Sequence, residues 1–275
     1  GGGWLERFEP RHISMIFNGW SRLRYTPSEL CMRALASAAN LVTWSADYKA
    51  RTRMTAQDVG LVSVGLIRIA ALSPSASSSS SSNQLLSQAF RAGTLIPASR
   101  WDVQAVANTL TAFAKYRTAT LAFMGEKKEG GGVVQRVCEV IESRDASLFR
   151  GRTNELASTV IALPACGITP SSHPDVWAQL SEACKKIQTS EANDSNNDMP
   201  AKVGSGVLSP VSATHLSMLI RGFSENGLLV RDNALQRHLV QLAQETMQAL
   251  PAVQFATMLA LLPALVILQD GLPSD

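Results

Sequence analysis

One helical pattern occurs six times along this chain of 275 residues. In each copy, mostly apolar or small side chains stand at relative positions 0, 3, 7 and 10, which is the spacing of one face of an α-helix. The copies begin at residues 13, 59, 103, 156, 213 and 253. Such spacings predict stacked helical pairs, because one pair cannot bury its own apolar face and needs a neighbour to cover it.

The composition agrees with an all-helical chain. Hydrophobic residues make up 45% of the sequence but aromatic residues only 6%, and this Ala- and Leu-rich mixture suits close helix packing better than a sandwich of sheets. The sequence therefore predicts an all-α fold, an α-solenoid of about five to six antiparallel helix pairs. No apolar stretch is long enough to predict a membrane span, since the longest, residues 258–268, is interrupted by Pro263.

Each pair should contain one helix that carries the repeated face and a second helix that follows it. The expected pairs are 10–25 with 28–46, 55–72 with 83–93, 100–117 with 133–147, 153–168 with 173–189, and 210–226 with 231–249, before a last helix at 251–268. Ser28 and Thr55 are expected to cap helices, and Asp58 completes a capping box with Thr55. Pro174 fits the first turn of its helix.

Polar insertions are expected to interrupt this array as disordered loops. Two lie at about 73–83, a serine run, and 125–132, which is rich in glycine and charge. A low-complexity linker at 190–206 separates repeats 1–4, in residues 1–189, from repeats 5–6, in residues 207–275. A single curved array is the simplest arrangement, although two lobes around the linker are an alternative.

The repeated pattern also predicts which side chains are buried. In the two clearest copies these are Ile13, Ile16, Trp20 and Leu23, and Val103, Val106, Leu110 and Phe113. The four cysteines, Cys31, Cys138, Cys166 and Cys184, stand in apolar helical patterns, without a CxxC spacing, and are expected to be buried free thiols.

The sequence contains no recognisable catalytic motif. It lacks the glycine-rich phosphate loops, the HExxH zinc motif and the GxSxG nucleophile elbow, and no two of its histidines are four residues apart. We therefore expect no enzyme, no cofactor and no metal site. The chain begins with three glycines and no Met, so we expect it to be a fragment or a processed product.

Charge is distributed unevenly along the chain. Residues 1–152 contain 19 Lys and Arg against 11 Asp and Glu, whereas residues 153–275 contain 6 against 11. The basic half suits a polyanion, because Lys and Arg neutralise phosphates. Its cations recur at the starts and ends of the repeated helices, next to aromatic residues such as Tyr25 and Trp101, which can stack on unpaired bases. The expected RNA-binding residues are Arg11, Arg22, Arg24, Arg51, Arg53, Arg100, Lys115 and Arg117.

Two segments carry a resemblance to a known family. Residues 104–115 read Gln-Ala-Val-Ala-Asn-Thr-Leu-Thr-Ala-Phe-Ala-Lys, and residues 11–23 repeat the pattern. The chain resembles the heptatricopeptide and octotricopeptide repeats of organelle RNA-binding proteins, which often end in a RAP domain. No RAP-like segment follows residue 268, so nuclease activity is not expected. The serine tract resembles insertions in protist proteins that bind mitochondrial ribosomal RNA.

The resemblance implies a non-catalytic subunit or assembly factor of the mitochondrial ribosome, in the mitochondrial matrix. RNA, and rRNA in particular, is the partner expected for the basic half, and other proteins for the acidic and apolar C-terminal half. The alternative is a protein–protein scaffold or an accessory subunit of another mitochondrial complex. A helical enzyme is the third hypothesis, which the missing motifs disfavour.

Overall fold

The computed structural model describes residues 9–44, 54–72, 80–120, 131–187, 211–249 and 263–268. These residues form helices, turns and short connections, with no strand among them, so the predicted all-α class is confirmed. Contacts divide the chain into two compact units, residues 1–144 and residues 145–275. The predicted low-complexity linker at 190–206 lies outside the described residues.

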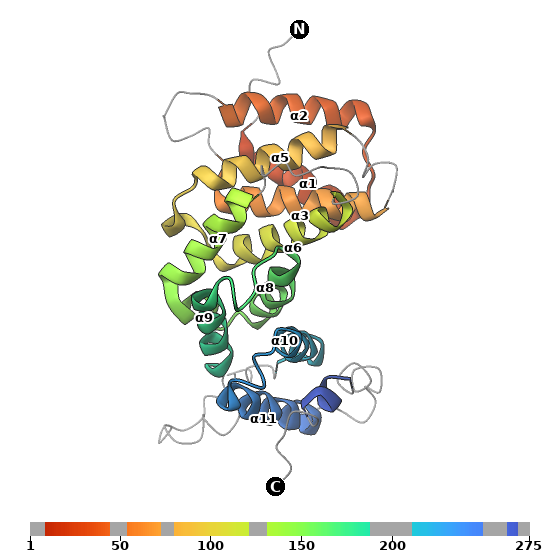
Figure 1. Cartoon of the computed structure of the whole chain (residues 1–275). Coiled ribbons are helices and arrows are strands. Elements are labelled where there is room, and N and C mark those ends of the chain that lie inside the picture. The colour runs from red at the N-terminus through yellow and green to blue at the C-terminus, as the bar shows by residue number, and fades with distance from the viewer. Residues whose placement is uncertain are drawn as a thin grey trace, which may run out of the picture. The chain divides into compact units, whose positions relative to one another are not determined.

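The helices of the first unit pack in two groups (Figure 1). In one group α3 packs against both α1 and α6, and in the other α5 packs against both α2 and α7. Contacts between α3 and α5 join the two groups. The bounds are α1 Pro10–Leu23, α2 Glu29–Trp44, α3 Ala56–Leu72, α5 Ser80–Leu95, the short η2 Ala98–Arg100, α6 Val103–Thr120 and α7 Gly131–Arg144.

Polar residues at the start of α3 attach it to α1. The backbone N–H of Asp58 donates to Thr55 Oγ1 at 3.2 Å and that of Thr55 donates to Asp58 Oδ2 at 3.0 Å, which confirms the predicted capping box. The other carboxylate oxygen of Asp58 accepts a 2.6 Å hydrogen bond from Ser14 Oγ of α1. Asp58 is buried, so these bonds compensate a carboxylate that would otherwise lose its hydration.

Two glycines let α3 approach both of its neighbours closely. A Cβ added to Gly65 would lie 2.9 Å from Cβ of Phe17 in α1, and one added to Gly60 would lie 3.2 Å from Cα of Ala105 in α6. Real Cβ atoms essentially never come within 3.0 Å of another heavy atom, so Gly65 is required by the space available.

The second unit contains η4 Asp145–Phe149, α8 Thr153–Ala165, α9 Pro174–Lys185, α10 Ala213–Glu225 and α11 Asn233–Ala249, with a helical turn at 263–268. In this unit α10 packs against α8, and α9 packs against α11 and η4. Gly222 of α10 meets Val160 of α8. The rings of Trp177 and Phe223 pack edge to face in the core, with centroids 6.3 Å apart. Pro174 opens α9, as predicted.

The repeated apolar face is correct for three helices. All four of its positions are buried in α3, α8 and α10. The buried sets are Val59, Val62, Leu66 and Ile69; Leu156, Thr159, Leu163 and Cys166; and Ala213, Leu216, Ile220 and Phe223. Of the copy that begins at 253, only Pro263 is described, and it is exposed.

The buried face of α1 is rotated by roughly a quarter turn about the helix axis from the face we predicted, at 100° per residue. Leu23 is 79% exposed, and Ile16 and Trp20 are half-buried. The buried residues are Pro10, Ile13, Ser14, Phe17 and Ser21. Ser14 and Ser21 can be buried because their hydroxyls are hydrogen-bonded, and a pattern of apolar residues alone does not include them.

Smaller corrections concern α6 and the insertions. Val106 and Leu110 are buried as predicted, but Val103 and Phe113 are half-buried. The serine insertion was expected to reach residue 83, yet α5 begins at Ser80, because Ser81 Oγ donates a 2.7 Å hydrogen bond to Glu29 of α2. The glycine-rich insertion was expected to reach residue 132, whereas α7 begins at residue 131. Residues 73–79, 121–130 and 190–206 lie outside the described residues.

Candidate nucleic-acid interface

The eight predicted RNA-binding residues all belong to or flank elements of the first unit. Five have described side chains, and all five are exposed. They are Arg11 and Arg22 in α1, Arg24 directly after α1, Arg100 in η2 and Lys115 in α6. Arg51 and Arg53 lie outside the described residues, and Arg117 belongs to α6 but its side chain is not described.

Most exposed cations of both units form no ion pair among described residues; Arg152 and Arg231 are examples in the second unit. Among described residues, none of the five side chains forms an ion pair. In the second unit, Lys185 Nζ lies 2.8 Å from carboxylates of both Glu182 and Asp232, and Arg221 Nε lies 2.7 Å from Glu225. Within the described part of the chain, the guanidinium and ammonium groups of these five cations are therefore not engaged by a carboxylate.

Arg24 adopts a backbone conformation that disfavours arginine. Its φ of 52° is left-handed, and the N–H of Tyr25 donates to the carbonyl of Trp20 to close α1. In the second unit, Gly167 after α8 and Gly227 after α10 take the same role, with φ of 85° and 68°. Glycine is the usual residue there because a Cβ is disfavoured at positive φ. An arginine at this position points to a use for its side chain.

Three aromatic rings lie beside these arginines. Trp20 packs edge to face on Phe17, with centroids 5.6 Å apart, and lies 6.0 Å from the exposed ring of Tyr25. Trp20 is half-buried, so it is less buried than the core residue we predicted and less exposed than a ring that stacks on a base. Tyr25 is the ring with most free surface, at 53% exposed, and Arg24 is its neighbour in sequence.

Arg68 is an exposed cation that the sequence analysis did not single out. It lies on α3, between the helices that carry Arg22 and Lys115. Its position in the sequence could have indicated it. Arg68 stands 46 residues after Arg22 and 47 residues before Lys115, close to the spacing of the repeats. It was missed because it is a single cation within an apolar helix, not part of a basic cluster.

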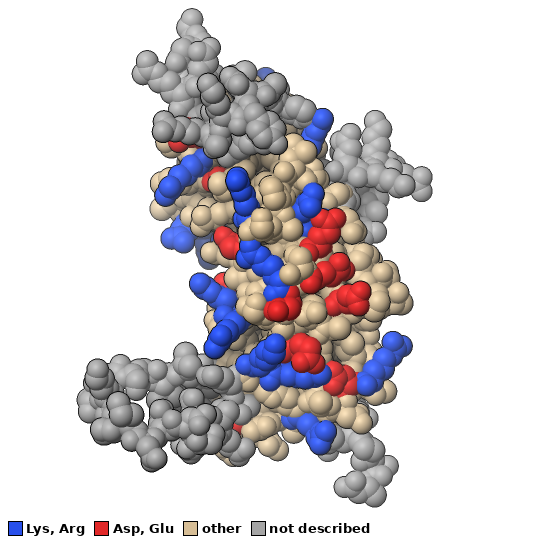
Figure 2. All heavy atoms as spheres, turned by 90° about the vertical axis from the view of Figure 1, so that its left-hand side faces the viewer, with Lys and Arg blue, Asp and Glu red and all other residues tan. Residues whose placement is uncertain are grey.

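Net charge follows the division into units. The first unit contains 17 Lys and Arg against 10 Asp and Glu, and the second contains 8 against 12. On the side of the molecule drawn in Figure 2, Lys and Arg side chains lie among Asp and Glu side chains, and neither sign forms an unbroken patch. On this side, a polyanion would therefore meet carboxylates as well as cations.

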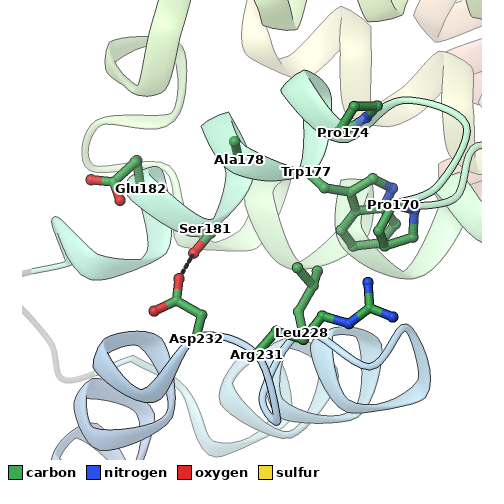
Figure 3. Close-up of a pocket in the computed structure, with 9 residues that line it drawn as sticks. All are labelled: Pro170, Pro174, Trp177, Ala178, Ser181, Glu182, Leu228, Arg231 and Asp232. Atoms are coloured by element: carbon green, nitrogen blue, oxygen red, sulfur yellow. Dashed lines mark hydrogen bonds between the residues drawn. The ribbon is translucent and has the colours of Figure 1, made fainter.

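The second unit has a small hollow of about 330 Å³. Trp177, Pro170 and Pro174 lie on one side of it, and Leu228 and Arg231 on the other (Figure 3). Trp177 is itself buried, and its indole N–H donates to the carbonyl of Ile168 at 3.3 Å. The lining is mostly apolar, and its polar members include Ser181, whose hydroxyl is hydrogen-bonded to Asp232.

A polar group beside this hollow joins α9 to α11. Asp232 accepts from Ser181 Oγ at 2.8 Å and from the N–H of Leu235 at 3.0 Å, and it pairs with Lys185. Burial alone would raise the pKa of Asp232, but the bonds from Lys185, Leu235 and Ser181 outweigh it and the pKa is lowered. The pKa of Lys185 is raised, since its bonds to Asp232 and Glu182 outweigh the opposing effect of burial. This group stabilises the helix pair.

The cysteines are consistent with structural roles. Cys138, Cys166 and Cys184 are buried, as predicted, whereas Cys31 is half-buried. Burial raises the pKa of the Cys138 thiol to about 12, and burial also raises the pKa of Cys184. Both thiols are therefore protonated and unreactive at neutral pH. The described residues bring together no group of three or more His, Cys, Asp or Glu side chains that could hold a metal ion.

Comparison with protein-family models, curated proteins and solved structures finds no match for the chain. Within the described residues, no helix combines the length and the apolar character that crossing a bilayer requires.

Proposed function

We propose that this protein is a non-catalytic RNA-binding protein whose first unit binds the RNA. The observation that carries the proposal is that the first unit holds the excess of cations, 17 Lys and Arg against 10 Asp and Glu, and that five of them, on or directly after α1 and on η2 and α6, are exposed without an ion pair among described residues. Leaving cations unpaired on a surface is expected where they neutralise phosphates. The left-handed Arg24 adds support, because its conformation favours glycine.

The proposal includes a solenoid of antiparallel helix pairs within each unit. Its support is that repeated helices pack on repeated helices, α1 on α3 and α3 on α6 in the first unit and α8 on α10 in the second, while the intervening helices pack on one another. Stacking of this kind brings equivalent surface positions of successive repeats side by side. A binding surface for an extended polymer follows from such an arrangement.

The second unit is proposed to bind proteins. Its balance of 8 Lys and Arg against 12 Asp and Glu repels phosphate, and its hollow beside Trp177 is mostly apolar. The resemblance to organelle helical-repeat proteins supports a role as a mitochondrial ribosome subunit or assembly factor in the mitochondrial matrix, with rRNA as the bound RNA. Cell fractionation followed by sequencing of the RNA that co-purifies with the native protein tests this part.

Ultraviolet crosslinking of the full chain to RNA of random sequence tests which unit binds RNA. We expect crosslinked peptides from residues 1–144 and none from residues 145–275. Affinity should also fall with salt, with a log–log slope of about −0.7 for each phosphate contacted on a single strand. Crosslinks confined to residues 145–275 would contradict the assignment to the first unit, and the absence of any crosslink would favour a protein–protein scaffold.

A further inference from the structure

The helices α1, α3 and α6 present an outward stripe at the same four positions. These are the second, sixth, ninth and thirteenth residues of each helix, which fall within about 60° of one another at 100° per residue. Except for Val64, the stripe residues are exposed or half-buried. The residues are Arg11, Met15, Asn18 and Arg22 on α1; Gln57, Leu61, Val64 and Arg68 on α3; and Gln104, Asn108, Thr111 and Lys115 on α6.

Contacts between the helices place equally numbered positions level with each other. The fifth and eighth residues of α1, Ser14 and Phe17, meet the third and tenth residues of α3, Asp58 and Gly65. The two helices therefore run in the same direction with no net offset. The fifth residue of α3, Gly60, meets the third and sixth residues of α6. Their starts are thus level as well, and Figure 1 shows α3 between α1 and α6.

The thirteenth position is a cation on all three helices. Arg22, Arg68 and Lys115 are exposed, and none of them forms an ion pair among described residues. Packed helices lie about 8–10 Å apart, so the three side chains form a row of roughly 20 Å across the helices. In the second unit the thirteenth residues of α8 and α10 are Ala165 and Glu225. Neither of these described positions in the second unit carries a cation.

We propose that Arg22, Arg68 and Lys115, which we call the thirteenth-position row, bind successive phosphates of a single RNA strand that crosses α1, α3 and α6. The inference rests on the proposed function and specifies its site. A single strand is favoured over a duplex because amide and hydroxyl groups of Asn18, Asn108 and Thr111 stand on the same stripe, where they can hydrogen-bond to the Watson–Crick edges that only unpaired nucleotides expose.

Arg68→Gln tests the row, and Arg33→Gln is its matched control. Both substitutions remove one exposed guanidinium from the first unit, but Arg33 lies on α2, outside the row. The full chain is titrated at several salt concentrations with a fluorescein-labelled 20-nucleotide RNA of random sequence, followed by anisotropy. Each phosphate contact contributes about −0.7 to the slope of log affinity against log salt concentration. Loss of one contact should therefore weaken binding of Arg68→Gln about fivefold at 0.1 M salt. Arg33→Gln should match the wild type in affinity and slope.

The outcomes separate this inference from the proposed function. If the wild type binds RNA but the two variants are equally affected or equally unaffected, the row is wrong and RNA binding stands. If a duplex binds as tightly as the single strand, or poly-L-glutamate of equal charge displaces the RNA equally well, the single-strand assignment is overturned. If the wild type fails to bind RNA, the proposed function itself falls. Circular dichroism melting confirms that both variants remain folded.

Discussion

Arg24 is the residue whose backbone conformation argues most directly against a purely structural role. Its φ of 52° lies in the region where the equivalent residues of the second unit are Gly167 and Gly227. The left-handed conformation costs a residue with a Cβ roughly 1 kcal/mol relative to glycine. Residues in such conformations occur more often at functional sites, where the side chain contributes something that compensates the cost.

Replacing Arg24 with Gly should therefore change stability and binding in opposite directions. We expect Arg24→Gly to raise the free energy of unfolding by about 1 kcal/mol, since glycine adopts positive φ without the Cβ penalty. RNA affinity should fall, because one exposed cation is lost. Chemical denaturation and anisotropy measure the two effects.

The control for this prediction lies in the second unit. Gly227 has φ of 68° and nothing within 4 Å of an added Cβ, so Gly227→Ala isolates the conformational cost. It should lower the free energy of unfolding by about 1 kcal/mol. If Arg24→Gly leaves both stability and RNA binding unchanged, the left-handed conformation has no functional meaning.

At the scale of the helix, close packing of α3 on α1 sets the strongest requirement. Gly65→Ala should lower the free energy of unfolding by about 1–2 kcal/mol, because overpacking costs about 1–3 kcal/mol and the better helix propensity of Ala returns at most about 1 kcal/mol. The added Cβ would meet backbone atoms of Phe17 at 3.0 Å, and these atoms cannot move independently of α1.

Gly19 provides the matched comparison on α1. Nothing lies within 4 Å of a Cβ added there, so Gly19→Ala should raise stability by about 0.5–1 kcal/mol through helix propensity alone. Thermal and denaturant unfolding of the two variants should thus shift in opposite directions. Stabilisation by both substitutions would show that α1 and α3 are not in close contact at Gly65.

The existence and order of the helices could be predicted from sequence because apolar spacing records which face each helix buries. This worked best for α3, α8 and α10, whose buried residues are almost all apolar or small. It failed for α1, because the buried face of this helix includes Ser14 and Ser21. Ser14 is hydrogen-bonded to Asp58 of α3, which only the folded chain brings near, and Ser21 to the carbonyl of Asn18 in the same helix. Leu23, in the last turn of α1, is exposed although it fits the pattern.

The candidate site was predictable only in part. Basic clusters in the sequence located Arg22 and Lys115, but alignment of these residues across helices depends on how α1, α3 and α6 pack. Arg68 became noticeable only when its helix was placed between the other two. The left-handed conformation of Arg24 is likewise a property of the folded backbone.

At the scale of the whole molecule, the two units should respond differently to acid. Burial lowers the pKa of His238, a half-buried residue of α11 in the second unit. A lowered pKa means that protonation favours the unfolded chain. The stabilising contribution is therefore complete above pH 6.5, the ordinary value, and is lost as pH falls through the lower pKa of the folded protein.

The wild type should consequently lose stability between pH 7.5 and pH 5, and His238→Gln should lose less. Urea unfolding at the two pH values measures the difference, with protease cleavage sites showing which unit opens. We expect acid-induced cleavage within residues 145–275. Equal pH dependence of the wild type and His238→Gln would exclude His238 as the cause.

The position of α3 between α1 and α6 has a consequence for how this protein can diverge among related organisms. Its buried residues touch partners on two repeated helices and on α5, so most changes there require compensating changes elsewhere. A larger residue at Gly60 would need a compensating change in α6, and one at Gly65 would need a compensating change in α1. Homologues should therefore retain the sequence of α3 longest, and the outer face of α1 should vary first wherever no ligand constrains it.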